Sequence, residues 1–222
     1  LAQAHEAYAN GKTKRYADLT ERAYDILQSV ATSATREQDI EDSIGGIIQM
    51  ADWNRKQMDT YRASIYKPNT VQGRLNPKWD QQIYWKHFDV ARDLYENALD
   101  RKETQAAHQA RLGLHTLLSD GANVYAVAAR KTLIAAHNQK RRGIFGLFAR
   151  MTRAQDYAGH VEAALKNYTE AIQLHKEAVS CLPDNKMHSA TKHHTKETLK
   201  KLLDERNGLK KAWQNKDTGQ IS

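Results

Sequence analysis

The sequence has 222 residues, with 34 Lys and Arg against 26 Asp and Glu, a net charge of +8, three prolines and one cysteine. This length suffices for a buried core in one large or two small domains. Cys181 alone excludes an intramolecular disulfide and a cysteine-based metal cluster. No run of about 18 apolar residues is present that would span a bilayer as a single helix.

The composition favours helices throughout. Ala, Gln, Lys, Glu, Arg and Leu, which have high helix propensity, dominate the sequence. Runs of β-branched residues, which would indicate strands, are missing. We therefore predict an all-α fold: an elongated helical bundle with long helices that ends in a C-terminal three-helix bundle.

The first predicted segment, 1–67, contains three helices. Two of them cover 2–9 and 13–31, and the second carries an apolar stripe at helical spacing. The third is a helix of about thirty residues, a length found in bundles and coiled coils, that follows 33–37 and ends near Ile65. Gly45 and Gly46 interrupt its apolar spacing, so we expect either a kink or close helix packing there.

The clearest break in the chain is "YKPNTVQGRLNPKW" at 66–79, which holds two of the three prolines. We predict a long loop here, followed by a central helical hairpin over 78–140. Its helices are expected at 78–101 and 103–139, the second with an interruption at Asp120-Gly121.

The stretch "QKRRGIFGLFARM" at 139–151 combines three consecutive cations with an apolar stripe. One interpretation places it in a membrane interface, with phenylalanine inserted and the cations against anionic lipid. The other is a connector whose phenylalanines pack on the core. The candidate membrane or partner contacts are Lys140, Arg141, Arg142, Phe145 and Phe148.

The third predicted segment, 153–216, begins with a regular spacing of small and aromatic residues, and Pro183 ends it. Small and aromatic residues follow each other at i, i+3, i+7 and i+10, namely Tyr168, Ala171, His175 and Ala178. The same spacing recurs from Phe88 to Ala98, but 80 residues away, which argues against a continuous repeat array. With Gly159, the stretch 154–185 resembles a tetratricopeptide repeat, although Gln155 and Glu162 replace the family's usual residues.

The tail "LLDERNGLKKAWQNKD" at 202–217 resembles the third helix of a microtubule-interacting and trafficking domain, a three-helix bundle. The residues that carry the likeness are Leu203, Asp204, Leu209, Lys210 and Trp213. In this alignment "KNYTEAIQLHKEAV" is the second helix and 153–165 the first. Pro183 departs from the family, whose second helix commonly continues past this point.

Both families bind short peptide segments and catalyse nothing, so the resemblance implies a partner helix or tail packed on the last helix. The implied partner contacts are Leu202, Leu203, Arg206, Leu209, Lys210 and Trp213. An alternative for the three leucines is that they form only the core of this bundle. Trp213, near the end of the helix, has the character of an interface anchor.

Charge supports an acidic partner. From Lys140 to the end, 16 Lys and Arg face 9 Asp and Glu, so +7 of the net +8 lies in the last 83 residues. Such a region attracts an acidic peptide, an anionic membrane surface or nucleic acid. A solvated lysine-rich helix surface is the plain alternative.

We find no motif for an enzyme, a cofactor or a metal. No phosphate-binding glycine loop, His-Glu-x-x-His or Gly-x-Ser-x-Gly occurs. Cys181 before Pro183 has the character of a packing residue, and adjacent histidines such as His193 and His194 point in different directions.

The sequence therefore predicts a non-enzymatic helical scaffold or adaptor that binds an acidic peptide or helical segment of a protein partner. Three alternatives stay open: a membrane-interacting or secreted effector acting through 139–151, a structural assembly subunit, and a nucleic-acid-binding module. The last lacks aromatic residues interleaved on a basic face. We expect a cytoplasmic location, with a membrane-peripheral or secreted one as alternatives, and the initial Leu1 indicates a processed product or a fragment.

Overall fold

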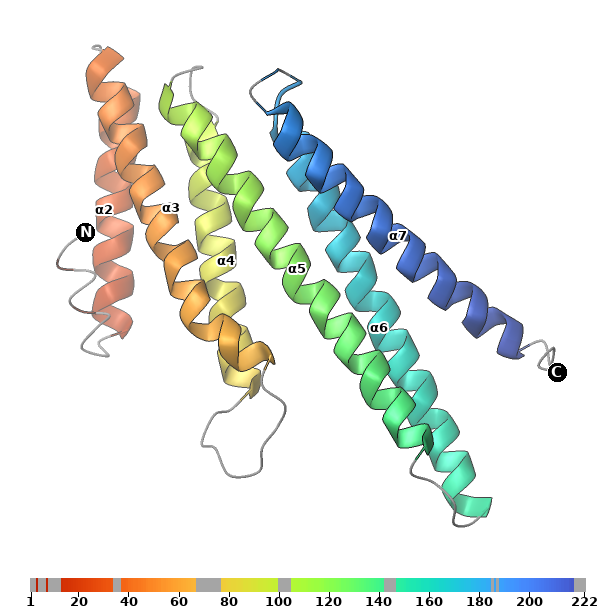
Figure 1. The fold of residues 1–222 in the computed structure, drawn as a ribbon. Helices are drawn as coiled ribbons and strands as arrows, with labels where there is room; N and C mark the ends of the chain where they lie inside the picture. The colour runs from red at the N-terminus through yellow and green to blue at the C-terminus, as the bar shows by residue number, and fades with distance from the viewer. Residues whose placement is uncertain are drawn as a thin grey trace. The chain divides into compact units, whose positions relative to one another are not determined.

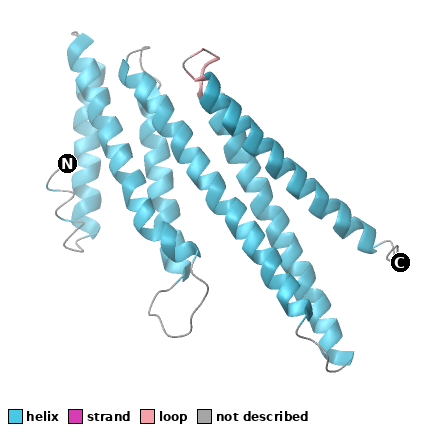
Figure 2. Ribbon diagram, in the orientation of Figure 1, coloured by secondary structure: helices cyan, strands magenta, loops and turns pink. Residues whose placement is uncertain are grey.

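A computed structural model describes residues 3, 7, 13–33, 37–66, 77–99, 105–141, 147–184, 186 and 188–217. These residues form helices and short turns, without a strand, so the all-α prediction is confirmed (Figure 2). The helices are labelled in Figure 1: α2 (Thr13–Ser33), α3 (Glu37–Tyr66), α4 (Pro77–Leu99), α5 (Gln105–Arg141), α6 (Leu147–Cys181) and α7 (Ser189–Asp217).

Contacts divide the chain into two compact units. Unit 1 comprises 1–61 and 74–117, and unit 2 comprises 62–73 and 118–222. The dividing points lie inside α3 and α5, whereas the three segments predicted from the sequence, 1–67, 78–140 and 153–216, are separated at loops. α3 and α5 therefore each contribute residues to both units.

The predicted long helices are present. The helix expected after 33–37 is α3, of 30 residues, and α4 covers the helix predicted from residue 78. The predicted interruption at Asp120-Gly121 is wrong, because α5 continues through both residues for 37 residues in all. A glycine inside a helix costs only about 1 kcal/mol, and burial of the adjoining Leu118 and Ala122 offsets this cost.

Unit 1 combines a large apolar core with polar contacts between helices. Tyr84, Phe88 and Tyr95 of α4 are buried with Ile44 and Ile47 of α3. The Tyr95 hydroxyl donates a hydrogen bond to the carboxylate of Asp52 on α3. At the start of α5, the Ala106 amide donates to Glu41 Oε1 at 2.7 Å, so a carboxylate satisfies one of the amides that a helix leaves open at its N-terminus.

Two glycines allow side chains to approach a helix backbone in unit 1. A Cβ on Gly46 would lie 2.8 Å from Leu27 Cδ2, and one on Gly113 would lie 2.3 Å from Tyr95 Cε1. Of the two alternatives for Gly45-Gly46, close packing therefore applies to Gly46, while α3 continues through both residues.

Three helices form the apolar core of unit 2. Its apolar cluster takes residues from the second half of α5, from α6 and from α7. The members of the cluster are Ala126, Ala129, Ala164, Tyr168, Ala171, Ile172 and Leu202. The alanines let the helices approach closely around the single large ring of Tyr168.

The composition of this bundle corrects the sequence analysis. The helices predicted at 153–165 and from 166 are one helix, because α6 runs unbroken from Leu147 to Cys181. Residues 160–170 contain no glycine or proline, so nothing in them ends a helix. The third helix is supplied instead by α5, which precedes the predicted segment.

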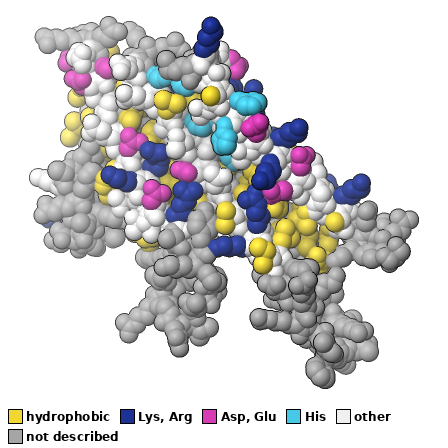
Figure 3. Space-filling model, viewed as in Figure 1, with side chains coloured by type: hydrophobic (Ala, Val, Ile, Leu, Met, Phe, Trp, Pro, Cys, Tyr) yellow, Lys and Arg dark blue, Asp and Glu magenta, His cyan; other side chains and the backbone are white. Residues whose placement is uncertain are grey.

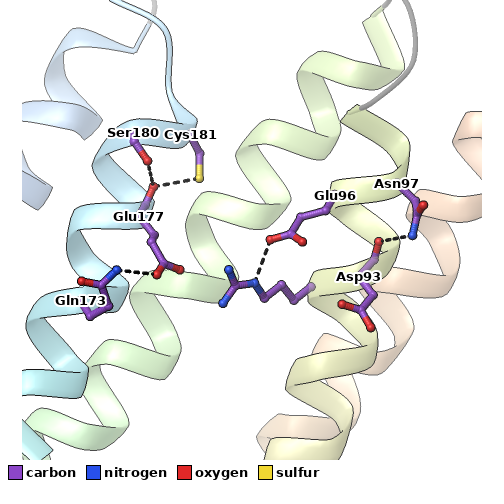
Figure 4. A network of polar contacts seen from close by, with 8 residues as sticks. Asp93, Glu96, Asn97, Gln173, Glu177, Ser180 and Cys181 are labelled. Carbon is purple, nitrogen blue, oxygen red and sulfur yellow. Dashed lines mark hydrogen bonds and ion pairs between the residues drawn. The ribbon is translucent and has the colours of Figure 1, made fainter.

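A short turn joins α6 to α7. The backbone carbonyl of Glu177 accepts from Ser180 Oγ at 2.7 Å and from Cys181 Sγ at 3.1 Å, in the last turn of α6 (Figure 4). The ammonium group of Lys192 on α7 donates to the Leu182 carbonyl and pairs with Asp184, both at 2.8 Å. This contact lowers the pKa of the Asp184 carboxyl. A cation placed on the carbonyls at a helix C-terminus stabilises that end.

Candidate partner-binding surface

The inward face of α7 follows a regular spacing of four and three residues. The stripe begins just before the helix and contains, in order, His188, Lys192, Thr195, Leu199, Leu202, Arg206, Leu209 and Trp213, all buried or half-buried. Such spacing is typical of helices that pack along one seam. The positions between them are mostly exposed, so one face of α7 holds the bundle and the other faces solvent.

The predicted contact residues on α7 fall into two groups. Leu202 is only 1 % exposed, and Leu203 and Leu209 pack against the apolar cluster. For Leu202 the prediction of a partner contact is wrong, because its place on the inward stripe buries it between helices. Lys210 is exposed, and the half-buried Arg206 donates to Asn207 Oδ1 at 3.2 Å.

Trp213 lies at the end of the stripe, half-buried. Its ring contacts Tyr157 of α6, with the centroids 6.0 Å apart and the planes tilted by 43°. Tyr157 is also half-buried. An aromatic pair that is partly open to solvent at a helix end provides the large, stiff apolar area that anchors many interfaces.

An ion pair joins α5 to α7 and sets their register. Arg130 Nε and Nη2 donate to the two carboxylate oxygens of Glu205, both at 3.1 Å, in a bidentate pair. The ring of Tyr168 on α6 lies beside this pair: burial, and then the Glu205 carboxylate, raise the pKa of Tyr168 to about 12. The three helices thus meet at one polar junction.

Beyond this junction lies an apolar patch. Ile134 is four residues after Arg130, and Leu209 is four residues after Glu205, so each lies one turn further along the same helix face. Ile134 is 60 % exposed, although it is apolar. We define the apolar patch as Leu133, Ile134, Tyr157, Leu209 and Trp213.

The figures agree with this placement within unit 2. The C-terminal halves of α5 and α7 run in the same direction and diverge toward their ends (Figure 1). On the face shown in Figure 3, hydrophobic side chains gather over this end of the bundle, and Lys and Arg side chains border them. Ile134, which is 60 % exposed, is apolar area at this end of unit 2 that the described helices leave uncovered.

Basic residues surround the apolar patch along α7. The helix carries eight Lys and Arg against four Asp and Glu, a net +4. A hollow of about 630 Å³ on its outer side extends to Glu205, and thus to the polar junction. Its lining residues are His193, Lys196, Glu197, Lys200, Lys201, Asp204 and Glu205. Three lysines stand against three carboxylates in this lining, so its charge is balanced, and the excess of lysine and arginine belongs to α7 as a whole. We call it the α7 hollow.

The second set of predicted contacts lies outside what the structure describes. Arg142 and Phe145 are not among the described residues, and for Lys140, Arg141 and Phe148 only the helix backbone is described. The alternatives for 139–151 therefore stay predictions. Among the described residues, no helix has the length and apolar character needed to cross a membrane.

The histidines of α7 are the residue type most suited to bind a metal ion on this surface. His193 Nε2 lies 3.3 Å from the Glu197 carboxylate, one turn along the helix. Within the described ranges, no group of three or more His, Cys, Asp and Glu side chains is placed to hold a metal ion.

Sequence reasoning missed three residues of this surface: Arg130, Ile134 and Tyr157. The signal for Ile134 was its place in "ARKTLIAA", where Leu133 continues the inward face of α5 and Ile134 falls outside it. Finding it required the knowledge that α5, rather than 153–165, is the first helix of the bundle.

Fold and surface together define an all-α helical-bundle protein with an apolar and basic surface at the open end of its second unit. Comparison with protein-family models, with curated proteins and with solved structures gives no match.

Proposed function

We propose that this protein is a non-enzymatic helical adaptor, and that unit 2 binds an acidic amphipathic helix of a protein partner. The observation that carries the proposal is the apolar patch beside α7, a helix with a net charge of +4. Ile134 is 60 % exposed and lies one turn beyond Arg130, the α5 residue of the ion pair with α7. A partner helix laid there would cover Ile134, Leu209 and Trp213, as a fourth helix of the bundle.

The positive charge of α7 favours a partner helix that carries carboxylates. Lys200 and Lys201 line the α7 hollow, and Lys210 is exposed next to Leu209. Carboxylates flanking the apolar face of the incoming helix would meet these ammonium groups. Since the lysines are exposed, their contribution falls as salt screens them over about 10 Å at 0.1 M. The apolar contribution is not lost in this way.

The adaptor fits a reducing, cytoplasm-like compartment, because its single cysteine forms no disulfide within the chain and is only partly exposed. The resemblance of the tail to a peptide-binding helix supports the same type of function. We propose Leu209, Lys210 and Trp213 as contacts, as the resemblance implies. We replace Leu202, which is buried, with the exposed Ile134 of α5.

A designed peptide tests the proposal. Its sequence is a helix of about twenty residues with leucines at i, i+3, i+4 and i+7 and glutamates on both flanks. Titration calorimetry against the full chain is expected to show binding that weakens from low to high salt. A peptide with lysine in place of each glutamate is the control, and its repulsion by α7 is expected to abolish binding.

Matched variants locate the site. Ile134→Glu is expected to reduce the affinity at least about tenfold, because it puts a charge into the covered apolar area. Lys210→Glu is expected to reduce it less, and Lys166→Glu, the same change at an exposed position of α6 away from the inward face, is expected to leave it unchanged. Equal effects of Lys210→Glu and Lys166→Glu would mean that only net charge matters and that the proposed surface is wrong.

A further inference from the structure

A second surface, in unit 1, has the opposite charge and the same apolar character. On α2, Ile26 is 64 % exposed and Val30 is 42 % exposed, and the two lie one turn apart on one face of the helix. Leu27 faces α3 instead, where its side chain approaches Gly46 and its carbonyl accepts from Ser43. The apolar stripe predicted on this helix is therefore wider than its contact with α3.

Acidic residues stand beside this ridge. A hollow of about 410 Å³ between α2 and α3 is lined by Leu27, Val30, Ser33, Asp39, Asp42 and Ser43. Asp39 and Asp42 are exposed. Over 25–42 the chain has five Asp and Glu and one Arg, a net −4, while α7 carries a net +4. We call Ile26, Val30, Asp39 and Asp42 the acidic ridge.

We propose that the acidic ridge of one copy of this protein binds the apolar patch and the exposed lysines of α7 of a second copy. The inference rests on the proposed function, since it names the partner helix as α2 of another chain. The argument is complementarity: α2 presents apolar residues at i and i+4, and Asp39 and Asp42 of α3 stand beside them. This combination matches Ile134, Leu209 and the α7 lysines.

Two different surfaces meet in such a contact, so the interface is heterologous. Each copy that uses its acidic ridge keeps its apolar patch open for the next copy, and association continues into a ring or an open chain. We expect larger assemblies as the protein concentration rises. We also expect them to dissociate with added salt, because exposed charges contribute to each contact.

Sedimentation velocity on the full chain and two variants tests this. Ile26→Glu disables the acidic ridge, and Ile134→Glu disables the apolar patch. Both residues are more than half exposed, and circular dichroism should show parent-like melting for each. We expect the parent to associate and each variant alone to be monomeric. Leu112→Glu, at an apolar residue of unit 1 that is 37 % exposed, is expected to associate like the parent.

The decisive sample is the mixture of the two variants. Ile26→Glu keeps an intact apolar patch, and Ile134→Glu keeps an intact acidic ridge, so the mixture is expected to form a 1:1 dimer that grows no further. A mixture that stays monomeric overturns the proposed pairing. So does association of Ile134→Glu with itself, which would indicate a contact between two identical surfaces.

Failure of this inference is separable from failure of the proposed function. If the parent stays monomeric while the designed acidic peptide binds, the second copy is not the partner and the adaptor surface stands. If neither the peptide nor a second copy binds, both proposals are wrong.

Discussion

The two units solve the packing of long helices in different ways. In unit 1, hydrogen-bonded side-chain pairs join the helices, such as Tyr95 with Asp52 and His87 with Asn54. Gly113 lies where the ring of Tyr95 approaches the helix backbone. Unit 2 has an apolar cluster rich in alanine and one bidentate ion pair, Arg130 to Glu205. Specific side-chain pairs favour one fixed arrangement of the helices. An apolar contact with few such pairs constrains the helices less, and the apolar area left exposed at one end of unit 2 is available to another helix.

The largest expected effect concerns the seam of unit 2. Leu202→Ala removes the α7 side chain from the apolar cluster, and we expect the free energy of unfolding of unit 2 to fall by about 2–5 kcal/mol. Hydrogen exchange of α7 amides measures it. A loss below about 1 kcal/mol would show that α7 is held mainly by its ion pair.

Glycine substitutions separate tight from open packing. Gly113→Ala forces a methyl group against the buried ring of Tyr95, and we expect a loss of about 1–3 kcal/mol. Gly208→Ala on α7 meets no atom within 4 Å, and we expect a gain of about 0.5–1 kcal/mol from higher helix propensity. Denaturant unfolding measures the change in the free energy of unfolding for both variants. Changes of the same sign would contradict the difference in packing between the two glycine positions.

The pH dependence of unit 1 follows from His87. This ring is buried between α3 and α4, where it stacks on Tyr61 with centroids 6.1 Å apart. Asn54 Nδ2 donates to the Met50 carbonyl at 3.0 Å, so Asn54 Oδ1 accepts from His87 Nδ1 at 2.8 Å. Burial, and then the charge of Lys86, lower the pKa of His87 to about 4.

The unfolded chain therefore binds a proton at His87 near pH 6.5, while the folded chain stays neutral there until about pH 4. Stability falls as the pH drops through this window, because the unfolded state binds more protons. In thermal melts from pH 7 to pH 4, His87→Gln is expected to lower the melting temperature at pH 7 and to reduce its dependence on pH. A variant with the parent's full dependence would assign the effect to other groups.

The smallest effect on stability is expected at the proposed binding surface. Lys210→Glu changes an exposed side chain and should leave the free energy of unfolding within about 0.5 kcal/mol of the parent. The same denaturant series that measures the glycine variants tests this. A larger loss would mean that Lys210 belongs to the bundle, and its effect on peptide binding would then have a structural origin.

Much of the helix layout followed from the sequence, because period and breakers are local signals. The two prolines at 66–79 mark the end of α3 and the start of α4, and Pro183 marks the end of α6. The spacing from Tyr168 to Ala178 did not indicate which helices pack on α6. Small residues recur at this spacing both where a helix packs on the next helix in sequence and where it packs on a helix far away in sequence. Here Ala171 packs in a cluster with residues of α5, from earlier in the chain.

The candidate surface was predictable only in part. Leu209, Lys210 and Trp213 stand on one helix, so a pattern over 202–217 brings them together. Ile134 joins them only through the register that Arg130 and Glu205 set, across 75 residues of chain. A pairing of that range leaves no periodic signal in the sequence.

The central claim is that the open end of unit 2 is a binding surface. The most direct measurement is amide hydrogen exchange of the full chain with and without the designed acidic peptide. The account predicts slower exchange in α7 from about 205 to 213 and in α5 around 130–134, with α4 unchanged. Bound peptide that slows exchange elsewhere, or that leaves both stretches unchanged, would contradict it.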